Sequence, residues 1–271
     1  MMKSASMIIA ALFIAVSLAM ALSSAQTEPS NACKVQAVGV MVTKGIPAKG
    51  YENHGSSTSV TLLISSTQDF LIGLDTSNSK VSKFFDDRGG KLDSNDVDIS
   101  EVPTLAQPGD PEPTGHDLPI DVDSSVLPAK GATQIHLKAS VALFCSQSLK
   151  TLQRKIPLRP GSELTFEKMT LRIKTVAAED ESSVRVTFVG RGSPQSVASF
   201  KRIAFADAAG KPIESALSFE GGGNEDNEKI ITGEWQYVLK TKAAEVTASV
   251  SYYSDVHSVQ VPIDVTVGLG L

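Results

Sequence analysis

Four carboxylates stand close together in the first half of the chain. Asp93, Asp96, Asp98 and Glu101 follow the spacing DxxDxDxxE. Calcium takes six to eight oxygen ligands, and flexible carboxylate-rich loops supply them. The spacing does not match an EF-hand, because the glycine and the bidentate glutamate of that loop are missing from their positions. Two interpretations remain open, a weak calcium site and a solvated acidic loop, and calcium is the one cofactor that the sequence suggests.

No other set of residues has a spacing that indicates catalysis or metal binding. The four histidines are isolated from one another, and the sequence contains no HExxH, CxxC or GxSxG motif. The sequence therefore predicts a protein that is not an enzyme. The alternative is a secreted hydrolase of polysaccharide or peptide, in which carboxylates of the acidic cluster act with Glu234 or Asp255 as acid and base.

The acidic cluster belongs to a longer segment, Leu92–Ala129, which has nine acidic residues and no Lys or Arg. Its prolines disfavour a long central strand, so we expect an extended polar loop. The whole chain has a formal net charge of −5. Without the nine negative charges of this segment the rest of the chain would be net positive, so the acidity is confined to the segment. That balance, without any cluster of Lys and Arg interleaved with aromatics, excludes a nucleic-acid-binding protein.

A seven-residue pattern, FxDxxGK, occurs twice, 120 positions apart. The copies are Phe85, Asp87, Gly90 and Lys91, and then Phe205, Asp207, Gly210 and Lys211. Each copy follows a strand-like run. The aspartate can accept a backbone N–H two residues on, and the glycine can adopt positive φ, as a tight turn requires. We interpret both copies as structural turns and not as binding sites.

Shorter similarities follow in the same order in both halves of the chain, which favours an internal duplication. Val40-x-Val42 resembles Leu171-x-Ile173, Ser59-Val60 resembles Ser183-Val184, Ala139-Ser140-Val141 resembles Ala248-Ser249-Val250, and Ile156-Pro157-Leu158 resembles Val261-Pro262-Ile263. The alternative is that any two β-domains share such alternation. Matches this short do not separate these explanations.

The apolar runs are short, alternating and rich in β-branched residues, and none has a helical period, so the fold class is all-β. Strands are expected at 34–43, 59–64, 70–74, 133–145, 152–158, 164–176, 183–189, 200–205, 234–239, 245–253 and 259–267. This number of strands predicts two tandem immunoglobulin-like antiparallel β-sandwiches. We place them at residues 26–160, with the loop 92–129, and at residues 161–271.

Residues 1–25 have the layout of a cleaved signal peptide. Lys3 precedes an apolar run from Met7 to Leu22, and Ser23-Ser24-Ala25 supplies small residues before the cut. A retained membrane anchor is the alternative, but the run is shorter than the roughly 20 residues that a spanning helix needs. We expect a secreted or periplasmic protein with no stable membrane span after cleavage.

Export would place the two cysteines in an oxidising compartment. Cys33 precedes the first strand-like run and Cys145 ends a strongly apolar one. A disulfide between them would close a loop of about 110 residues and stabilise the first domain by a few kcal/mol. The alternative is one buried thiol and one exposed thiol.

The sequence therefore predicts an exported, non-enzymatic protein with a role in binding, adhesion or envelope structure. Its partner would be an extracellular or envelope protein or a glycan, and not a nucleic acid. Sandwich domains bind through end loops or exposed strand edges, so the candidate surfaces are 45–57, 92–129 and 221–228. Besides the hydrolase, a calcium-stabilised interaction module is a further alternative.

Overall fold

The computed structural model describes residues 33–44, 56–93, 97–102, 115–224 and 230–270. The fold is almost entirely antiparallel β-sheet, which confirms the predicted all-β class. The expected signal peptide, residues 1–25, lies outside the described residues. Within them, no helix has both the length and the apolar character that a membrane crossing would need.

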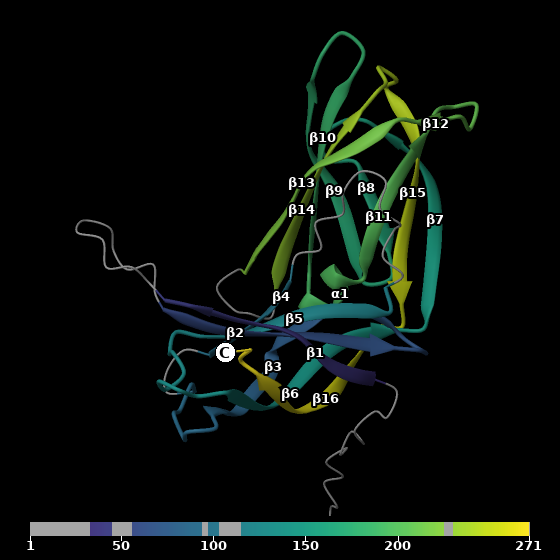
Figure 1. The fold of residues 1–271 in the computed structure, drawn as a ribbon. Helices are drawn as coiled ribbons and strands as arrows, with labels where there is room; N and C mark the ends of the chain where they lie inside the picture. The colour runs from purple at the N-terminus through teal and green to yellow at the C-terminus, as the bar shows by residue number, and fades with distance from the viewer. Residues whose placement is uncertain (1–32, 45–55, 94–96, 103–114, 225–229, 271) are drawn as a thin grey trace, which may run out of the picture.

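Four sheets pack in pairs and form two sandwiches, one above the other in Figure 1. The lower one, sandwich 1, pairs the sheet β1-β2-β5-β4 with the sheet β16-β6-β3. Its strands are β1 (Cys33–Thr43), β2 (Ser57–Ser66), β3 (Phe70–Asp86), β4 (Val97–Glu101), β5 (Asp117–Ser124), β6 (Gln134–Ser146) and β16 (His257–Gly268). Aliphatic side chains from both sheets form its core, in which Leu62, Ile120 and Leu137 have no exposed surface.

The upper one, sandwich 2, pairs the sheet β13-β14-β10-β9-β8 with the sheet β12-β11-β15-β7. Its elements are β7 (Ser148–Pro157), β8 (Glu163–Phe166), β9 (Met169–Ala178), β10 (Val184–Gly192), α1 (Pro194–Ala198), β11 (Phe200–Ala206), β12 (Pro212–Ile213), β13 (Ser215–Asn224), β14 (Ile231–Leu239) and β15 (Glu245–Ser254). Its core is aromatic, with Phe188, Phe205 and Tyr237 packed against one another.

A two-stranded ribbon connects the sandwiches. Strands β6 and β7 follow each other with one residue between them, and so nearly do β15 and β16. β6 pairs with β16 in sandwich 1, and β7 pairs with β15 in sandwich 2. At the crossing the buried Ser146 hydroxyl donates to the carbonyl oxygen of Ser254, and Asp255 turns the chain with a φ of 56°. β7 therefore follows the last consecutive strand of sandwich 1 but belongs to sandwich 2. Likewise, β16 follows the last strand of sandwich 2 but belongs to sandwich 1.

This pairing differs from the expected division at residue 160. β7 lies before that boundary, yet Ile156 is buried in the core of sandwich 2. β16 lies in the second half, yet Val261 and Ile263 are buried in the core of sandwich 1. Alternation along a strand shows which side chains are buried but not which sheet buries them, so both strands were placed with their neighbours in sequence.

The acidic segment also differs from the expected loop, because it contributes β4 and β5 to a sheet. β5 lies between β2 and β4, with Leu118, Ile120 and Val122 facing the core. The carbonyl oxygen of Pro119 faces the β4 side, where it accepts the Val102 N–H. The missing N–H of Pro119 would face the same side, just where the pairing with β4 ends, so the proline fits there. The missing N–H of a proline is tolerated where no neighbouring strand needs it.

The repeated turn exists in both halves, but its copies align with an offset of 121 and not 120. The Asp86 carboxylate accepts N–H groups of Arg88 and Gly90, and Gly89 has a φ of 81°. In the second copy, the Asp207 carboxylate accepts N–H groups of Ala209 and Lys211, and Gly210 has a φ of 81°. Asp86 and Gly89 therefore hold the places that the sequence pattern gave to Asp87 and Gly90.

The residues displaced from the pattern have other contacts. The Asp87 carboxylate accepts the N–H and the hydroxyl of Thr133 just before β6, and the side-chain hydrogen bond holds the pKa of Asp87 below its usual value. Phe85 stacks on His136 with ring centroids 5.0 Å apart, whereas Phe84 is fully buried as Phe205 nearly is. The backbone of Lys91 forms an isolated antiparallel β-bridge with that of Phe85.

Candidate functional site

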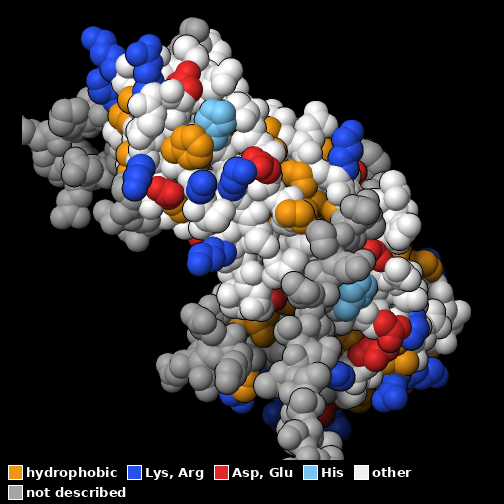
Figure 2. Space-filling view, turned by 90° about the horizontal axis from the view of Figure 1, so that it is seen from below, with side chains coloured by type: hydrophobic (Ala, Val, Ile, Leu, Met, Phe, Trp, Pro, Cys, Tyr) orange, Lys and Arg blue, Asp and Glu red, His pale blue; other side chains and the backbone are white. Residues whose placement is uncertain are grey.

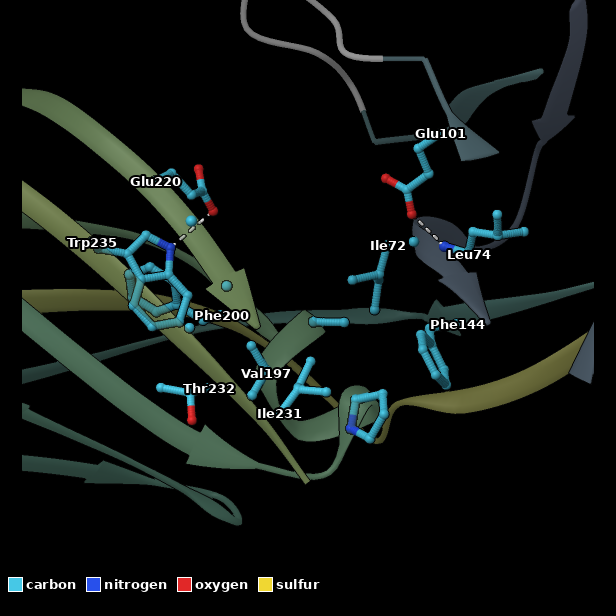
Figure 3. A pocket seen from close by; sticks show the side chains of 16 residues that line it. Ile72, Leu74, Glu101, Phe144, Val197, Phe200, Glu220, Ile231, Thr232 and Trp235 are labelled. Carbon is cyan, nitrogen blue, oxygen red and sulfur yellow. Dashed lines mark hydrogen bonds between the residues drawn. The ribbon is translucent and has the colours of Figure 1, made fainter. Parts of the chain in front are cut away.

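The two sandwiches enclose a cleft of about 550 Å³ at their junction, shown in Figure 3. Both sandwiches contribute to its walls. From sandwich 1 come Ile72, Gly73, Leu74, Glu101 and Phe144, and from sandwich 2 come Pro194, Val197, Ala198, Phe200, Glu220, Gly221, Gly222, Ile231, Thr232, Gly233 and Trp235. These residues define what we call the cleft. The described residues that line it include two carboxylates and no Lys, Arg or His.

Glycines make room for the aromatic wall of the cleft. Trp235 points from β14 toward the inside of sandwich 2, where only 4% of its surface is exposed and its ring lies 4.6 Å from that of Phe200. A Cβ atom at Gly233 or Gly190 would overlap the indole ring or the side chains around it. Gly222 lies opposite Gly233 in the β13–β14 pairing. The absence of side chains at Gly190 and Gly233 therefore makes room for the indole ring and its neighbours.

Glu220 lies directly opposite Trp235 on the edge strand β13. The indole Nε1–H donates a hydrogen bond of 2.8 Å to Glu220 Oε1. Directly opposite residues in an antiparallel pair project to the same side of the sheet, so the carboxylate lies on the inner side, beside the aromatic wall. The bond fixes one oxygen and leaves Oε2 available to a ligand.

Glu101 approaches from the other sandwich, at the end of the edge strand β4. Its Oε1 accepts the N–H of Leu74 on β3, and the absence of a side chain on Gly73 lets the carboxylate come close. Partial burial raises the pKa of Glu101, and the Leu74 hydrogen bond partly offsets this rise. The residue still keeps an exposed surface, so the carboxylate is only partly removed from water.

The cleft thus combines an apolar surface with two carboxylates from different sandwiches. Figure 3 shows Glu101 and Glu220 on opposite sides of the opening, with Phe200 and Val197 below them. Glu101 and Glu220 are both exposed, and the lining combines polar with apolar groups. Two negative charges on the walls of one cleft attract a cation. An ammonium or guanidinium group on an apolar stem matches both features.

The structure does not bring the predicted acidic cluster together as a metal site. Asp93 accepts the N–H of Phe84, Asp98 lies opposite Asp123 on the neighbouring strand, and Glu101 faces the cleft. Asp96 lies outside the described residues. Among those described, no group of three or more His, Cys, Asp or Glu side chains could hold a metal ion. The calcium hypothesis therefore gains no geometric support.

The carboxylates of the hydrolase alternative are also separated. Glu234 forms an ion pair of 2.8 Å with Lys174 and lines a different hollow. Asp255 lines a third hollow at the crossing of the ribbon. Neither lines the cleft with Glu101. The carboxylate that does so, Glu220, was missed because nothing in the sequence shows which exposed glutamate of an edge strand lies beside a cleft.

Two of the three surfaces predicted from the sequence do meet at the cleft. Glu101 comes from the segment 92–129, and Gly221 and Gly222 come from the segment 221–228. The other candidate surface, 45–57, lies almost wholly outside the described residues. Trp235, which we did not propose as part of a site, is both core and cleft wall.

The cysteines are present as two free thiols, so the structure does not support the predicted disulfide. Cys33 opens β1 opposite Ser66, and Cys145 lies in β6 between Leu71 and His257. Both contact the core of sandwich 1. Burial raises the pKa of both thiols, that of Cys145 to about 12. These values describe structural thiols and not nucleophiles.

Basic and acidic side chains are interspersed on the face seen from below in Figure 2. Elsewhere in sandwich 1, Lys138 and Asp264 are cross-strand partners whose charged atoms lie 2.6 Å apart between β6 and β16. These two charges balance each other. The cleft differs from this pair, since its two carboxylates have no basic partner among the residues that line it.

Comparisons with known proteins give little. No family model matches the chain, and no curated protein matches it. A solved structure described as "The crystal structure of the conserved domain protein from Bacillus anthracis" covers 90% of this chain and 89% of its own, at 11% identity and a TM-score of 0.27. A TM-score this low supports no inference about the fold or function of this chain.

Proposed function

We propose that this chain is an exported, non-enzymatic binding protein that holds a cationic group in the cleft between two immunoglobulin-like sandwiches. One observation carries the proposal. Glu101 and Glu220 come from edge strands of different sandwiches and line one cleft, without a basic residue among the described ones that line it. A cation supplied from outside would balance these two carboxylates.

The order of the strands supports the immunoglobulin-like part of the proposal. In sandwich 1 the sheet β1-β2-β5-β4 faces β3-β6-β16. In sandwich 2, apart from the additional strands β8 and β12, the sheet β9-β10-β14-β13 faces β11-β15-β7. Seven-strand immunoglobulin domains have the order A-B-E-D on one sheet and C-F-G on the other. Both sandwiches fit that order, with the last strand supplied by the other half of the chain. We take this as support for a duplication followed by an exchange of last strands.

Export rests on the sequence pattern of residues 1–25, which lies outside the described residues. In an extracellular setting, ligands of the proposed chemistry are basic segments of proteins and free amines. The cleft accepts the stem of a lysine or arginine along Phe144 and Ile72, while its charged end reaches the carboxylates. Such amphipathic side chains suit a site with apolar walls and polar groups at its rim.

Tryptophan fluorescence tests the proposal directly, because Trp235 is the single tryptophan of the chain and lines the cleft. N-acetyl-lysine methylamide is titrated against the protein, with the neutral N-acetyl-norleucine methylamide as the matched probe. We expect a saturable change with the lysine probe only. The double variant Glu101→Gln/Glu220→Gln should weaken binding at least tenfold.

Glu234→Gln is the control variant, since Glu234 is on the same strand as Trp235 but pairs with Lys174 outside the cleft. It should bind like the unchanged protein. Equal binding of the neutral probe, or equal loss in the control and in the double variant, contradicts the proposal.

Glycoside hydrolysis is the second candidate, and one observation favours it. Glu101 has a raised pKa and shares the cleft with Glu220, as a general acid and a second carboxylate would. Release of reducing ends from a polysaccharide, abolished by Glu101→Gln, would establish it. A polysaccharide that stays intact with both the unchanged protein and the variant removes the candidate.

A further inference from the structure

Strand β13 is an edge of its sheet, and its inner side borders the cleft. It pairs with β14 along nine residues, from Ser215 to Asn224, and the sheet order ends with it. An edge strand presents unpaired N–H and C=O groups on its free side, which are a template for another strand. Glu220, Gly221 and Gly222 of this strand line the cleft.

The side chains of β13 leave much of that edge open. Leu217 and Phe219 are 48% and 50% exposed, which is unusual for large apolar residues on a strand. The ring of Phe219 lies over Gly221 along the strand. A bulge between Leu217 and Phe219 and the inward Glu220 are ways in which proteins discourage indiscriminate pairing at an edge. They restrict the partners of β13 but do not cover it.

Other edges are less suitable. β8 and β12 are short, with four and two residues. β7 is long, but Lys150, Arg154 and Lys155 are exposed along it. β1 exposes Val38 and Met41, but it is the edge of its sheet opposite to β4, which carries Glu101. β13 alone among these combines length, exposed apolar side chains and a place in the cleft wall.

We propose that an extended, basic segment of a partner protein adds to β13 as a further strand and places a lysine or arginine side chain between Glu220 and Glu101. This inference rests on the proposed function and names the kind of ligand. Added strands lie about 4.8 Å away, and directly opposite residues are about 5 Å apart. A basic residue opposite Glu220 then meets its carboxylate on the side that faces Glu101.

Charge complementarity sets the chemistry of the partner. A lone amine would use only the two carboxylates. A strand adds main-chain hydrogen bonds for affinity, and its alternate side chains supply specificity. Apolar residues of the partner can contact Phe219, which is 50% exposed and lies on the side of the sheet opposite to Glu220. An alternating sequence of basic and β-branched residues matches this surface best.

Backbone methylation distinguishes strand addition from side-chain binding. The probe is a nine-residue peptide that alternates valine with lysine, compared with two versions N-methylated on the odd or on the even residues. Along one side of a strand only alternate N–H groups face the neighbour. We therefore expect one methylated version to bind at least tenfold more weakly and the other to bind nearly as well, by Trp235 fluorescence.

Two variants compare the candidate edges. Phe219→Lys adds a charge to β13, and Val38→Lys adds the same charge to the exposed edge β1. Phe219→Lys should weaken binding of the unmethylated peptide at least tenfold, whereas Val38→Lys should leave it unchanged. When the peptide is present, amide hydrogen exchange should show protection of β13 in the unchanged protein but not in Phe219→Lys.

The outcomes separate this inference from the proposed function. If both methylated peptides bind like the parent while Glu101→Gln/Glu220→Gln still abolishes binding, strand addition is wrong and the cation site stands. If neither the peptide nor N-acetyl-lysine methylamide binds, both are wrong. A concentration-dependent dimer in sedimentation that Phe219→Lys dissociates would show that β13 pairs with a second copy, which also overturns the inference.

Discussion

The two sandwiches have the same order of strands but different cores. In sandwich 1 the buried cluster is aliphatic, with Phe84 as its one fully buried aromatic side chain among the described residues. In sandwich 2 it contains Phe166, Phe188, Phe200, Phe205, Trp235 and Tyr237. Glycines accommodate the ring of Trp235 in this core, and the cleft opens beside them.

The sandwiches also differ in how they depend on each other. Every buried residue of the second cluster lies between Ile156 and Val250. The first cluster is divided between β1–β6 and the distant strand β16. Sandwich 2 is therefore an insertion between two strands of sandwich 1. The following predictions test this asymmetry and the turn and charge differences that accompany it.

The largest effect should come from cutting the chain at different places. A fragment of residues 148–254 keeps β7 and the whole second core, so it should fold alone. A fragment of residues 161–271 lacks β7, leaves β15 unpaired on one side and carries β16 without its partner β6. It should be unfolded, since it loses a whole strand and the buried Ile156, and a domain is stabilised by only roughly 5–15 kcal/mol. Near-UV circular dichroism of Trp235 measures both.

Adding a peptide of residues 148–160 to the second fragment provides the control, because it returns β7 in trans. Recovery of the tryptophan signal is expected. Cooperative folding of residues 161–271 without the peptide would show that β7 is dispensable for sandwich 2.

Thiol reactivity should distinguish the sandwiches next, since both cysteines belong to sandwich 1. Iodoacetamide reacts with the thiolate. With a pKa near 12, Cys145 should react at pH 8 roughly a thousandfold more slowly in the folded protein than in the unfolded one. Between about pH 9 and 12 the unfolded chain loses this proton first, so raising the pH should lower the stability of sandwich 1.

Mass spectrometry of the alkylated peptides follows both cysteines, and the urea-unfolded protein supplies the reference rate. Alkylation of the unfolded protein that requires prior reduction would show that the Cys33–Cys145 disulfide predicted from the sequence forms after all. Rapid alkylation of native Cys145 would contradict its burial.

The two turns should respond unequally to the loss of their aspartates. The Asp86 carboxylate is buried and accepts three backbone N–H groups, from Arg88, Gly90 and Ala129. Asp207 accepts two and is more exposed. Asp86→Ala should lower the free energy of unfolding by about 3 kcal/mol and Asp207→Ala by about 1 kcal/mol. Urea titration measures each variant.

Asp87→Ala checks the offset of 121 in the same titration. If Asp87 were the counterpart of Asp207, its loss would disrupt the first turn. We expect instead a smaller effect than that of Asp86→Ala, because Asp87 holds Thr133 at the surface.

The smallest effect should come from the ion pair of Lys138 and Asp264, which links β6 to β16. Both side chains are largely exposed, at 47% and 69%. A double-mutant cycle with alanine should give a coupling of about 0.5 kcal/mol, falling with added salt. A coupling of several kcal/mol would mean that surface charge, and not the burial of Val261 and Ile263, holds β16 in sandwich 1.

Much of this fold could be predicted from the sequence. The runs at 34–43, 133–145 and 259–267 became β1, β6 and β16 almost unchanged, because period-2 alternation reports a strand with one buried face. β5 was missed because its proline and aspartates outweighed its alternation. The one-residue slip in the turn arose because Phe, Asp and Gly each occur doubled at 84–90, so both offsets match these three residue types. Hydrogen bonds, φ and burial distinguish the two offsets.

The candidate site was far less predictable. Glu101 was proposed, but as a calcium ligand, and Glu220 was not proposed at all. Which sheet receives β7 and β16, and hence which edges face each other across the cleft, depends on pairing between strands far apart in the chain. A local pattern carries no information about such pairing.

The crossing ribbon has a mechanical consequence. β1 and β16 both belong to sandwich 1 and lie near each other, so a pull applied between these two strands would load sandwich 1 alone. Sandwich 2 would lie outside the loaded path, joined to sandwich 1 through the two connections β6–β7 and β15–β16. If force reaches the protein through β1 and β16, one wall of the cleft lies on the loaded sandwich and the other on the unloaded one. A ligand held by both walls would be released as sandwich 1 unfolds.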